Sequence, residues 1–422
     1  MRGHPALSHS TEVTRPRSGT RLSPECRLVF ASARLACDGS LITELLEGPL
    51  DWARVIVIAE REKATPVMWR MIESASAGGL AIPAEAAAHL RRSSMVHDFR
   101  MLRLSARIEK TISVLHARGV PVLLLKGAAL ANSIYGSFTL RPMSDVDLLV
   151  RTSDVSQARD AIIESGWPET TEPMFQSLLH DQQHLPPFLD TEPTGLRVEL
   201  HTMLLPPDQP FGFSSEHYWA GATAAKAPLG TALVADPHRL LLHACLHFAW
   251  SHTMHFGAWR TFRDVGALID APAFDWDAFI ALVRGLKGAS CGYWTLRLAN
   301  RMSGVPVPAD VLRALAPPMS TRVSDALERH FVAMIAPGEA PPCPSVKLAR
   351  LLWLAALRPR WSGYAGAGRY DPENKWARAR GTASTERLPE RIVRHAMGIR
   401  HWWNFAWRTI VAFGLAIATA RL

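Results

Sequence analysis

The spacing of apolar positions divides the chain into helical and sheet-like regions. Over residues 40–119, apolar residues recur every three or four positions, most regularly in the run that begins at residue 97. This spacing predicts a helical N-terminal region whose last helix stops at Gly119. Residues 1–24 are rich in Arg, Pro, Ser and Thr without periodicity, and we expect a disordered basic arm there.

The pattern changes abruptly at residue 120. Residues 120–126, 144–150 and 197–203 form short apolar or alternating runs that predict strands, while 128–135 and 153–165 predict helices between them. This alternation of strands and helices indicates a sheet-containing core over residues 120–235.

Helical spacing returns after Asp236-Pro237 and predicts a helical C-terminal domain over residues 236–336. A basic extension, residues 337–422, follows and begins with a linker of four prolines, residues 337–344. An apolar helix is expected near its end, but the uninterrupted apolar part, residues 409–420, is too short to span a bilayer. Three placements of residues 391–420 stay open: packing on the chain itself, lying at a membrane surface, or docking on a partner.

Composition excludes several classes of protein. Hydrophobic residues make up 48% and charged residues 20% of the 422 residues, as in a soluble globular protein. The five cysteines are scattered without a CxxC pair, which argues against a disulfide framework or a zinc site and fits a reducing cytoplasm. No apolar stretch follows the N-terminal arginines, so no signal peptide is predicted.

The formal charge of +9 is concentrated in the extension, which carries 14 Lys/Arg against 4 Asp/Glu from residue 341 onward. The body before it is close to neutral, so we do not expect nucleic acid as a partner. The extension is interpreted either as a solvated surface or as a contact for an anionic partner or membrane.

Three carboxylates suggest the chemistry. Asp145 and Asp147 are two positions apart on one predicted strand and therefore project from the same face. Glu199 lies on the third predicted strand, on the same face as Arg197 and His201. No cation is adjacent to the aspartates in sequence, so we expect neutralisation from outside, and divalent metal is the usual solution. Three such carboxylates can hold two Mg²⁺ ions roughly 3.5–4 Å apart.

Other residues have both a functional and a structural interpretation. Gly127 could let backbone N–H groups face phosphate oxygens with Lys126 adding a point charge, or the two could be a turn glycine and a lysine that extends to solvent. Arg141 is a candidate clamp for a triphosphate, or a partner of the aspartates. Tyr135 is expected to pack rather than to stack on a base, and His201 either supports Glu199 or has a structural role.

The histidines at positions 243, 247, 252 and 255 suggest zinc at first sight. Their segment lacks a suitably placed Cys or carboxylate partner, so we interpret them as structural or substrate-pocket residues. Asp264 either lies near the site or pairs with Arg260 one helical turn earlier.

The stretch LLLKGAALANSIYGSFTLRPMSDVDLLVR, between Val122 and Arg151, resembles a poorly characterised bacterial nucleotidyltransferase family of the DNA polymerase β superfold. RVELHTML resembles that family's third-carboxylate strand, and HACLHFAWSHTMHFGAWRTFRDVGALI its helical segment with Arg263 and Asp264. The likeness covers about residues 40–300. It implies an α+β fold: a polymerase β-like nucleotidyltransferase core, with a small mixed sheet and helices, between helical N-terminal and C-terminal parts.

The resemblance also implies an activity. The expected enzyme transfers a nucleoside monophosphate from an NTP, most simply ATP, to a hydroxyl or phosphate of an unidentified acceptor. Asp145, Asp147 and Glu199 would hold two Mg²⁺ ions, with Mn²⁺ as an alternative, and Lys126, Gly127, Arg141 and Ser144 would face the nucleotide. Lys126-Gly127 stands where the superfold usually has Gly-Ser or Gly-Gly, and Glu199 where Asp is commoner. A catalytically weak nucleotide-binding regulator and a nucleic-acid modifier are the alternatives.

Overall fold

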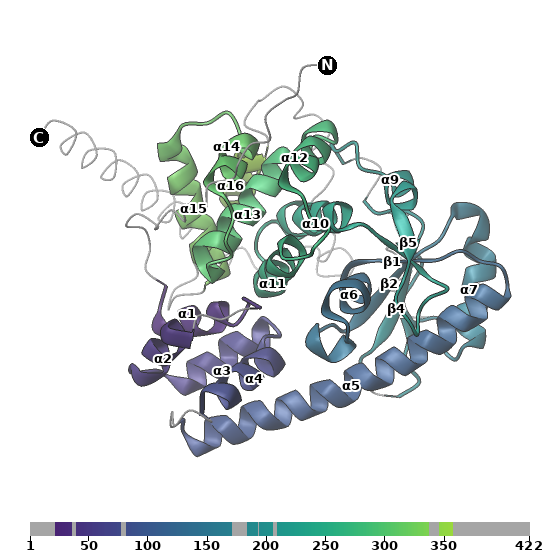
Figure 1. The fold of residues 1–422 in the computed structure, drawn as a ribbon, viewed down its shortest axis with the longest axis horizontal. Coiled ribbons are helices and arrows are strands. Elements are labelled where there is room, and N and C mark those ends of the chain that lie inside the picture. The colour runs from purple at the N-terminus through teal and green to yellow at the C-terminus, as the bar shows by residue number, and fades with distance from the viewer. Residues whose placement is uncertain are drawn as a thin grey trace, which may run out of the picture.

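The computed structural model describes residues 22–35, 39–76, 82–170, 184–192, 194–205, 209–336 and 346–357. A helical N-terminal part, a small sheet with its own helices and a larger group of C-terminal helices lie side by side (Figure 1). The fold is α+β, as the resemblance implied. The expected N-terminal arm lies almost entirely, and the segment 391–420 wholly, outside the described residues.

The N-terminal part is formed by α1 (Pro24–Ala31), α2 (Gly39–Glu47), α3 (Trp52–Arg61), α4 (Thr65–Ser76) and α5 (Ala84–Ala117). Asp51 caps α3 by accepting a hydrogen bond from the Arg54 backbone N–H. Helix α5 is 34 residues long and begins well before the periodic run at residue 97. The predicted stop is confirmed, since Gly119 has φ +72°. Helix α5 extends from α4 to the sheet region (Figure 1).

The sheet has six strands in the order β3-β4-β2-β1-β6-β5. The central strands are β1 (Leu123–Leu124), β2 (Asp145–Leu149) and β4 (Arg197–His201), and the outer ones are β3 (Phe188–Leu189), β5 (Ala222–Ala224) and β6 (Leu233–Ala235). β2 and β4 are parallel, as are β1 and β6, whereas the other three pairs are antiparallel. The predicted mixed sheet is confirmed, although β3, β5 and β6 carry no clear pattern in the sequence.

The first predicted strand is shorter than expected because Lys126 already begins a helix. That helix, α6 (Lys126–Leu130), continues as a π-helical turn over Ala131–Tyr135. The predicted second helix is α7 (Val155–Glu164), and Gly166 follows with φ +100°. Helix α9 (Ser215–Ala220) precedes the outer hairpin.

The C-terminal helices begin where predicted. Asp236 caps the first of them by accepting from the Arg239 N–H, and Pro237 occupies its first turn. The helices are α10 (Pro237–Leu246), α11 (Ala258–Ile269), α12 (Trp276–Gly285), α13 (Ala289–Ser303), α14 (Ala309–Leu315), α15 (Thr321–Ile335) and α16 (Val346–Leu357). A second π-helical turn, His247–Ser251, extends α10. Helix α16 lies in the segment expected as an extension, and its Trp353 donates to the Ala249 carbonyl.

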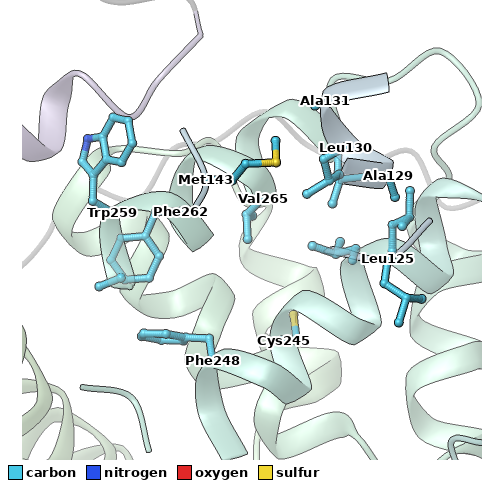
Figure 2. Packing of buried hydrophobic residues seen from close by; sticks show 14 of the residues in the cluster. Leu125, Ala129, Leu130, Ala131, Met143, Cys245, Phe248, Trp259, Phe262 and Val265 are labelled. Carbon is cyan, nitrogen blue, oxygen red and sulfur yellow. The ribbon is translucent and has the colours of Figure 1, made fainter. Parts of the chain in front are cut away.

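Apolar side chains join the sheet-bearing part to the C-terminal helices. Leu125, Ala129 and Leu130 come from the start of α6, and Cys245, Phe248, Phe262 and Val265 come from the α10–α11 region; all are buried in one cluster (Figure 2). The indole N–H of Trp259 reaches back to the Val29 carbonyl in α1. Because packed interiors tolerate little displacement, this cluster fixes α10 and α11 relative to the strands.

Among the described helices, none is both long and apolar enough to cross a membrane.

A buried carboxylate ties α5 to the sheet and generates a testable prediction. Asp190 accepts hydrogen bonds from Arg103, Arg107 and Thr194. Burial alone would raise the pKa of Asp190, but these partners lower it to about 2. A depressed pKa stabilises the fold above the ordinary carboxyl pKa near 4, and this stability is lost as pH falls toward 2.

We therefore expect Asp190→Asn to lower the free energy of unfolding at pH 7 by about 2 kcal/mol. Urea unfolding at stepped pH should show the gap to the wild type narrowing below about pH 4. Asp160→Asn, at an exposed carboxylate of α7, serves as the control. A gap that stays constant down to pH 3 would contradict the role of Asp190.

Candidate functional site

The parallel pairing of β2 and β4 brings the predicted carboxylates together. In this register Asp145 lies beside Arg197 and Asp147 beside Glu199. All four side chains line one cavity of about 330 Å³. The expected placement of the three carboxylates on a common face is thus confirmed.

The cavity lies between the sheet and the C-terminal helices. Its floor carries Asp145, Asp147 and Glu199, and α10, the second π-helical turn and the first two turns of α11 form the wall on the helical side. The second π-helical turn contributes His247 to the lining, and such turns are often found at functional sites. The polar lining residues are Lys63, Lys126, Arg141, Ser144, Asp145, Asp147, Arg197, Glu199, Tyr218, His243, His247, His252, Arg260, Thr261 and Asp264.

The protein itself supplies cations to the carboxylates. Asp147 accepts from Lys126 Nζ at 2.6 Å and from His201 Nε2 at 2.8 Å. Arg197 donates to Asp145 at 2.9 Å and to Glu199 at 3.0 Å. The expectation that neutralisation must come from outside was therefore wrong. Lys126 is 21 residues away from Asp147 and Arg197 is 52 residues away from Asp145, so adjacency in the sequence could not show either pair.

These contacts keep Asp147 and Glu199 ionised. Burial by itself would raise the pKa of Asp147, but the Lys126 ammonium and His201 hold it well below its ordinary value. Burial also opposes ionisation of Glu199, yet His201 Nε2, 3.8 Å from its carboxylate, and the charge of Lys126 lower the pKa of Glu199. In the opposite sense, the charges of Asp147 and Glu199 raise the pKa of Lys126 against the effect of burial.

Two carboxylates of the cavity floor and the buried His201 beside them fit a divalent cation. Donor atoms of Asp147, Glu199 and His201 all lie within 4.8 Å of one another. His201 Nδ1 is buried and has no hydrogen-bond partner among the described residues. This group differs from the predicted ligand set in one member, with His201 in the place of Asp145. Carboxylate oxygens are suitable ligands for Mg²⁺ and Mn²⁺. An imidazole ligand favours a transition metal such as Mn²⁺ over Mg²⁺.

Lys126 and Gly127 turn the chain tightly into the cavity. Lys126 has φ +44°, in the left-handed region that favours glycine. A Cβ on Gly127 would lie 3.2 Å from an Arg141 side-chain nitrogen, so any larger residue would crowd the arginine. Strain of this kind persists where the surroundings enforce it, and it often marks functional sites.

Arg141 is engaged by a partner that the sequence did not indicate. Its guanidinium donates to Asp264 at 2.9 and 2.6 Å and to the Pro142 carbonyl at 2.7 Å. The Tyr135 hydroxyl donates to the same Asp264 at 2.9 Å, so Tyr135 packs as expected. Arg141 does not pair with the aspartates of β2, and Asp264 does not pair with Arg260: both alternatives were wrong. The buried Arg141–Asp264 pair joins the core to α11.

Three of the four clustered histidines line the wall opposite the carboxylates. Burial lowers the pKa of His243 to about 3 and that of His252 to about 4, so both rings are neutral at pH 7. His243 shares a hydrogen bond with the Tyr218 hydroxyl at 2.9 Å. The metal-binding group found among the described residues includes none of them. His255 does not line the cavity.

Sequence patterns missed several lining residues. Lys63 lies in the turn between α3 and α4, where a single lysine after a helix carries no signal. Arg260 and Tyr218 occupy helical positions that resemble ordinary surface or core residues. Ser144 was predicted to face the nucleotide, and the structure adds that its hydroxyl accepts from Lys63 Nζ at 2.9 Å.

The small mixed sheet, with two acidic strands beside a cavity rich in cations, is that of an α+β nucleotidyltransferase. Residues 48–304 match the model of a family described as an uncharacterised nucleotidyltransferase, and the chain belongs to this family. The match extends over more than half of the chain, from before α3 to the end of α13. No curated protein and no solved structure matches the chain significantly.

The buried pair between Arg141 and Asp264 generates a prediction about stability. Asp264→Asn leaves a buried guanidinium without its charge partner, and such losses cost about 3–5 kcal/mol. We expect urea unfolding to show a decrease of at least about 3 kcal/mol. The double variant Arg141→Met/Asp264→Leu removes both charges and should be less destabilised than Asp264→Asn. If the free energy of unfolding of Asp264→Asn were within about 1 kcal/mol of the wild-type value, the pair would not be a main source of stability, and Arg141 would be assigned chiefly to ligand binding.

Proposed function

We propose that this chain transfers a nucleoside monophosphate from an NTP to a hydroxyl or phosphate of an acceptor. The observation that carries this proposal is the pairing of β2 with β4, which aligns Asp145, Asp147 and Glu199 on the floor of the cavity. In such a reaction the acceptor oxygen forms a bond to the α-phosphorus while the bond to pyrophosphate breaks. The acceptor proton passes to a base, for which Glu199 is our candidate.

Asp145, Asp147 and Glu199 are assigned as ligands of two divalent ions, Mg²⁺ or Mn²⁺, with His201 as a further donor. When bound, such ions polarise the α-phosphate and lower the pKa of the attacking hydroxyl. The side chains would position the reactants: Asp147 is held from two sides by Lys126 and His201, and Glu199 by Arg197. Side chains fixed in this way keep their geometry during the reaction.

The nucleotide is assigned to the side of the cavity formed by Lys126, Gly127, Arg141 and Ser144, and ATP is the expected substrate. Gly127 gives the phosphates room, and Lys126 supplies a positive charge. Arg141 would act here mainly by fixing α11 through Asp264. The helical part over 40–119, the core over 120–235 and the helices over 236–336 are our proposed division of the chain.

A second function is favoured by one specific observation. Every carboxylate on the cavity floor already has a cationic partner from the chain, as expected of a protein that binds nucleotide as a regulatory ligand. Calorimetry separates the two proposals: binding of ATP without release of pyrophosphate supports the regulator. Pyrophosphate release that depends on an acceptor supports the transferase.

For the transferase we expect Asp147→Asn to lower the rate by at least about 100-fold. The amide keeps the size of the carboxylate but loses its charge, so a divalent ion is held weakly. The assay follows label from [α-³²P]NTPs into protein and small-molecule fractions of a cell extract, in the presence of Mg²⁺ or Mn²⁺.

The control for this experiment is Asp160→Asn on α7, which should transfer label like the wild type. Thermal unfolding of both variants checks that the folded state persists. Activity of folded Asp147→Asn near the wild-type level would refute the assigned role of Asp147.

A further inference from the structure

Two cations in the cavity make no salt bridge to a carboxylate within the part of the chain that the structure describes. Each acidic lining residue makes an ion pair with Lys126, Arg141 or Arg197. Among the described residues, neither Lys63 nor Arg260 forms a salt bridge, although both line the same cavity. Lys63 and Arg260 therefore carry positive charge that the ion pairs of the cavity do not use.

Lys63 is held over the cavity by its neighbour in the turn. Glu62 is buried, and its Oε2 accepts from the backbone N–H of Trp259 at 3.2 Å in the first turn of α11. This contact fixes the α3–α4 turn next to Arg260. The backbone of Lys63 has φ +58°, a conformation that residues other than glycine rarely adopt. The Lys63 Nζ donates a hydrogen bond to Ser144 Oγ. Although Lys63 is exposed, its ammonium group is therefore held at the cavity by this turn and by Ser144.

The surroundings of the two cations are unfavourable for charge. Loss of solvent around the ammonium group, together with the charge of Arg260, lowers the pKa of Lys63 to about 8, although the charge of Asp145 acts in the opposite direction. Burial and the charge of Arg141 lower the pKa of Arg260. Arg100 of α5 adds a further positive charge near Lys63. Cations gathered at this cost are stabilised when an anion binds between them.

We propose that Lys63 and Arg260, with the Ser144 hydroxyl, form a phosphate-binding subsite between the α3–α4 turn and the first turn of α11. A guanidinium offers paired N–H donors to a phosphate, and an ammonium adds a point charge. The phosphate belongs either to the β,γ-end of the nucleotide or to the acceptor. Only this choice of sources rests on the proposed function, since anion binding itself requires no transfer reaction.

The test measures binding of inorganic pyrophosphate to the full-length protein by calorimetry. We expect Lys63→Gln and Arg260→Gln each to weaken binding at least tenfold. The matched control for Lys63→Gln is Lys287→Gln, since Lys287 is exposed and shares the positive φ, at +60°. Arg92→Gln, at an exposed position of α5, is the control for Arg260→Gln. Both controls should bind like the wild type.

Pyrophosphate affinities of folded Lys63→Gln and Arg260→Gln within twofold of the wild type would overturn the subsite. Where a glutamine variant unfolds, Lys63→Arg and Arg260→Lys replace it. These variants keep the charge and should retain binding to within about threefold, whereas a tenfold loss in both would also overturn the subsite.

Repeating the titration with saturating α,β-methylene-ATP and Mg²⁺ identifies the source of the phosphate. Pyrophosphate binding abolished by the analogue assigns the subsite to the nucleotide. Binding that survives and still depends on Lys63 assigns it to the acceptor. Either result supports the subsite, even if the labelled-NTP assay detects no transfer and the proposed function fails.

Discussion

The parallel pairing of β2 with β4 is the constraint on which the site depends. It places Asp147 directly beside Glu199 and Asp145 beside Arg197, and a shift by one residue would turn one whole set of side chains into the core. Val146, Leu148, Val198 and Leu200 are buried on the opposite face and hold the register through their packing. The same alternation that stabilises the strands therefore forces like charges together, and the surrounding cations offset this repulsion.

Cations from all three parts of the chain meet around those strands. Lys63 comes from the N-terminal helices, Lys126 from the core and Arg260 from α11, and Glu62 and Asp264 act as buried ties between the parts. The helical parts therefore complete the cavity rather than only covering it. The matched region of the family, residues 48–304, includes all of these residues.

Local pattern was sufficient to predict the acidic strands, because period-two alternation and burial operate within a few residues. It also located the end of α5 before Gly119, the helix α7 and the start of α10. It missed the partners: Asp264 is 123 residues from Arg141, and Glu62 is 197 residues from Trp259. Contacts at such separations are set by packing of whole elements, which no short window contains. The two-residue strands β1 and β3 were equally hard to delimit, since their neighbours in the sheet define them.

The ion pairs on the cavity floor also bear on how a charged substrate could enter. An NTP carries about four negative charges, which two divalent ions would balance, so the complex arrives close to neutral. On binding, Asp145, Asp147 and Glu199 would exchange Lys126 and Arg197 for the ions, and those cations would turn to phosphate oxygens. Such an exchange of partners leaves no buried charge uncompensated at either end, which is the condition for holding so many ionised groups in one cavity. Lys63 and Arg260 stand outside this exchange of carboxylate partners, and their charge remains available for the phosphate of the proposed subsite.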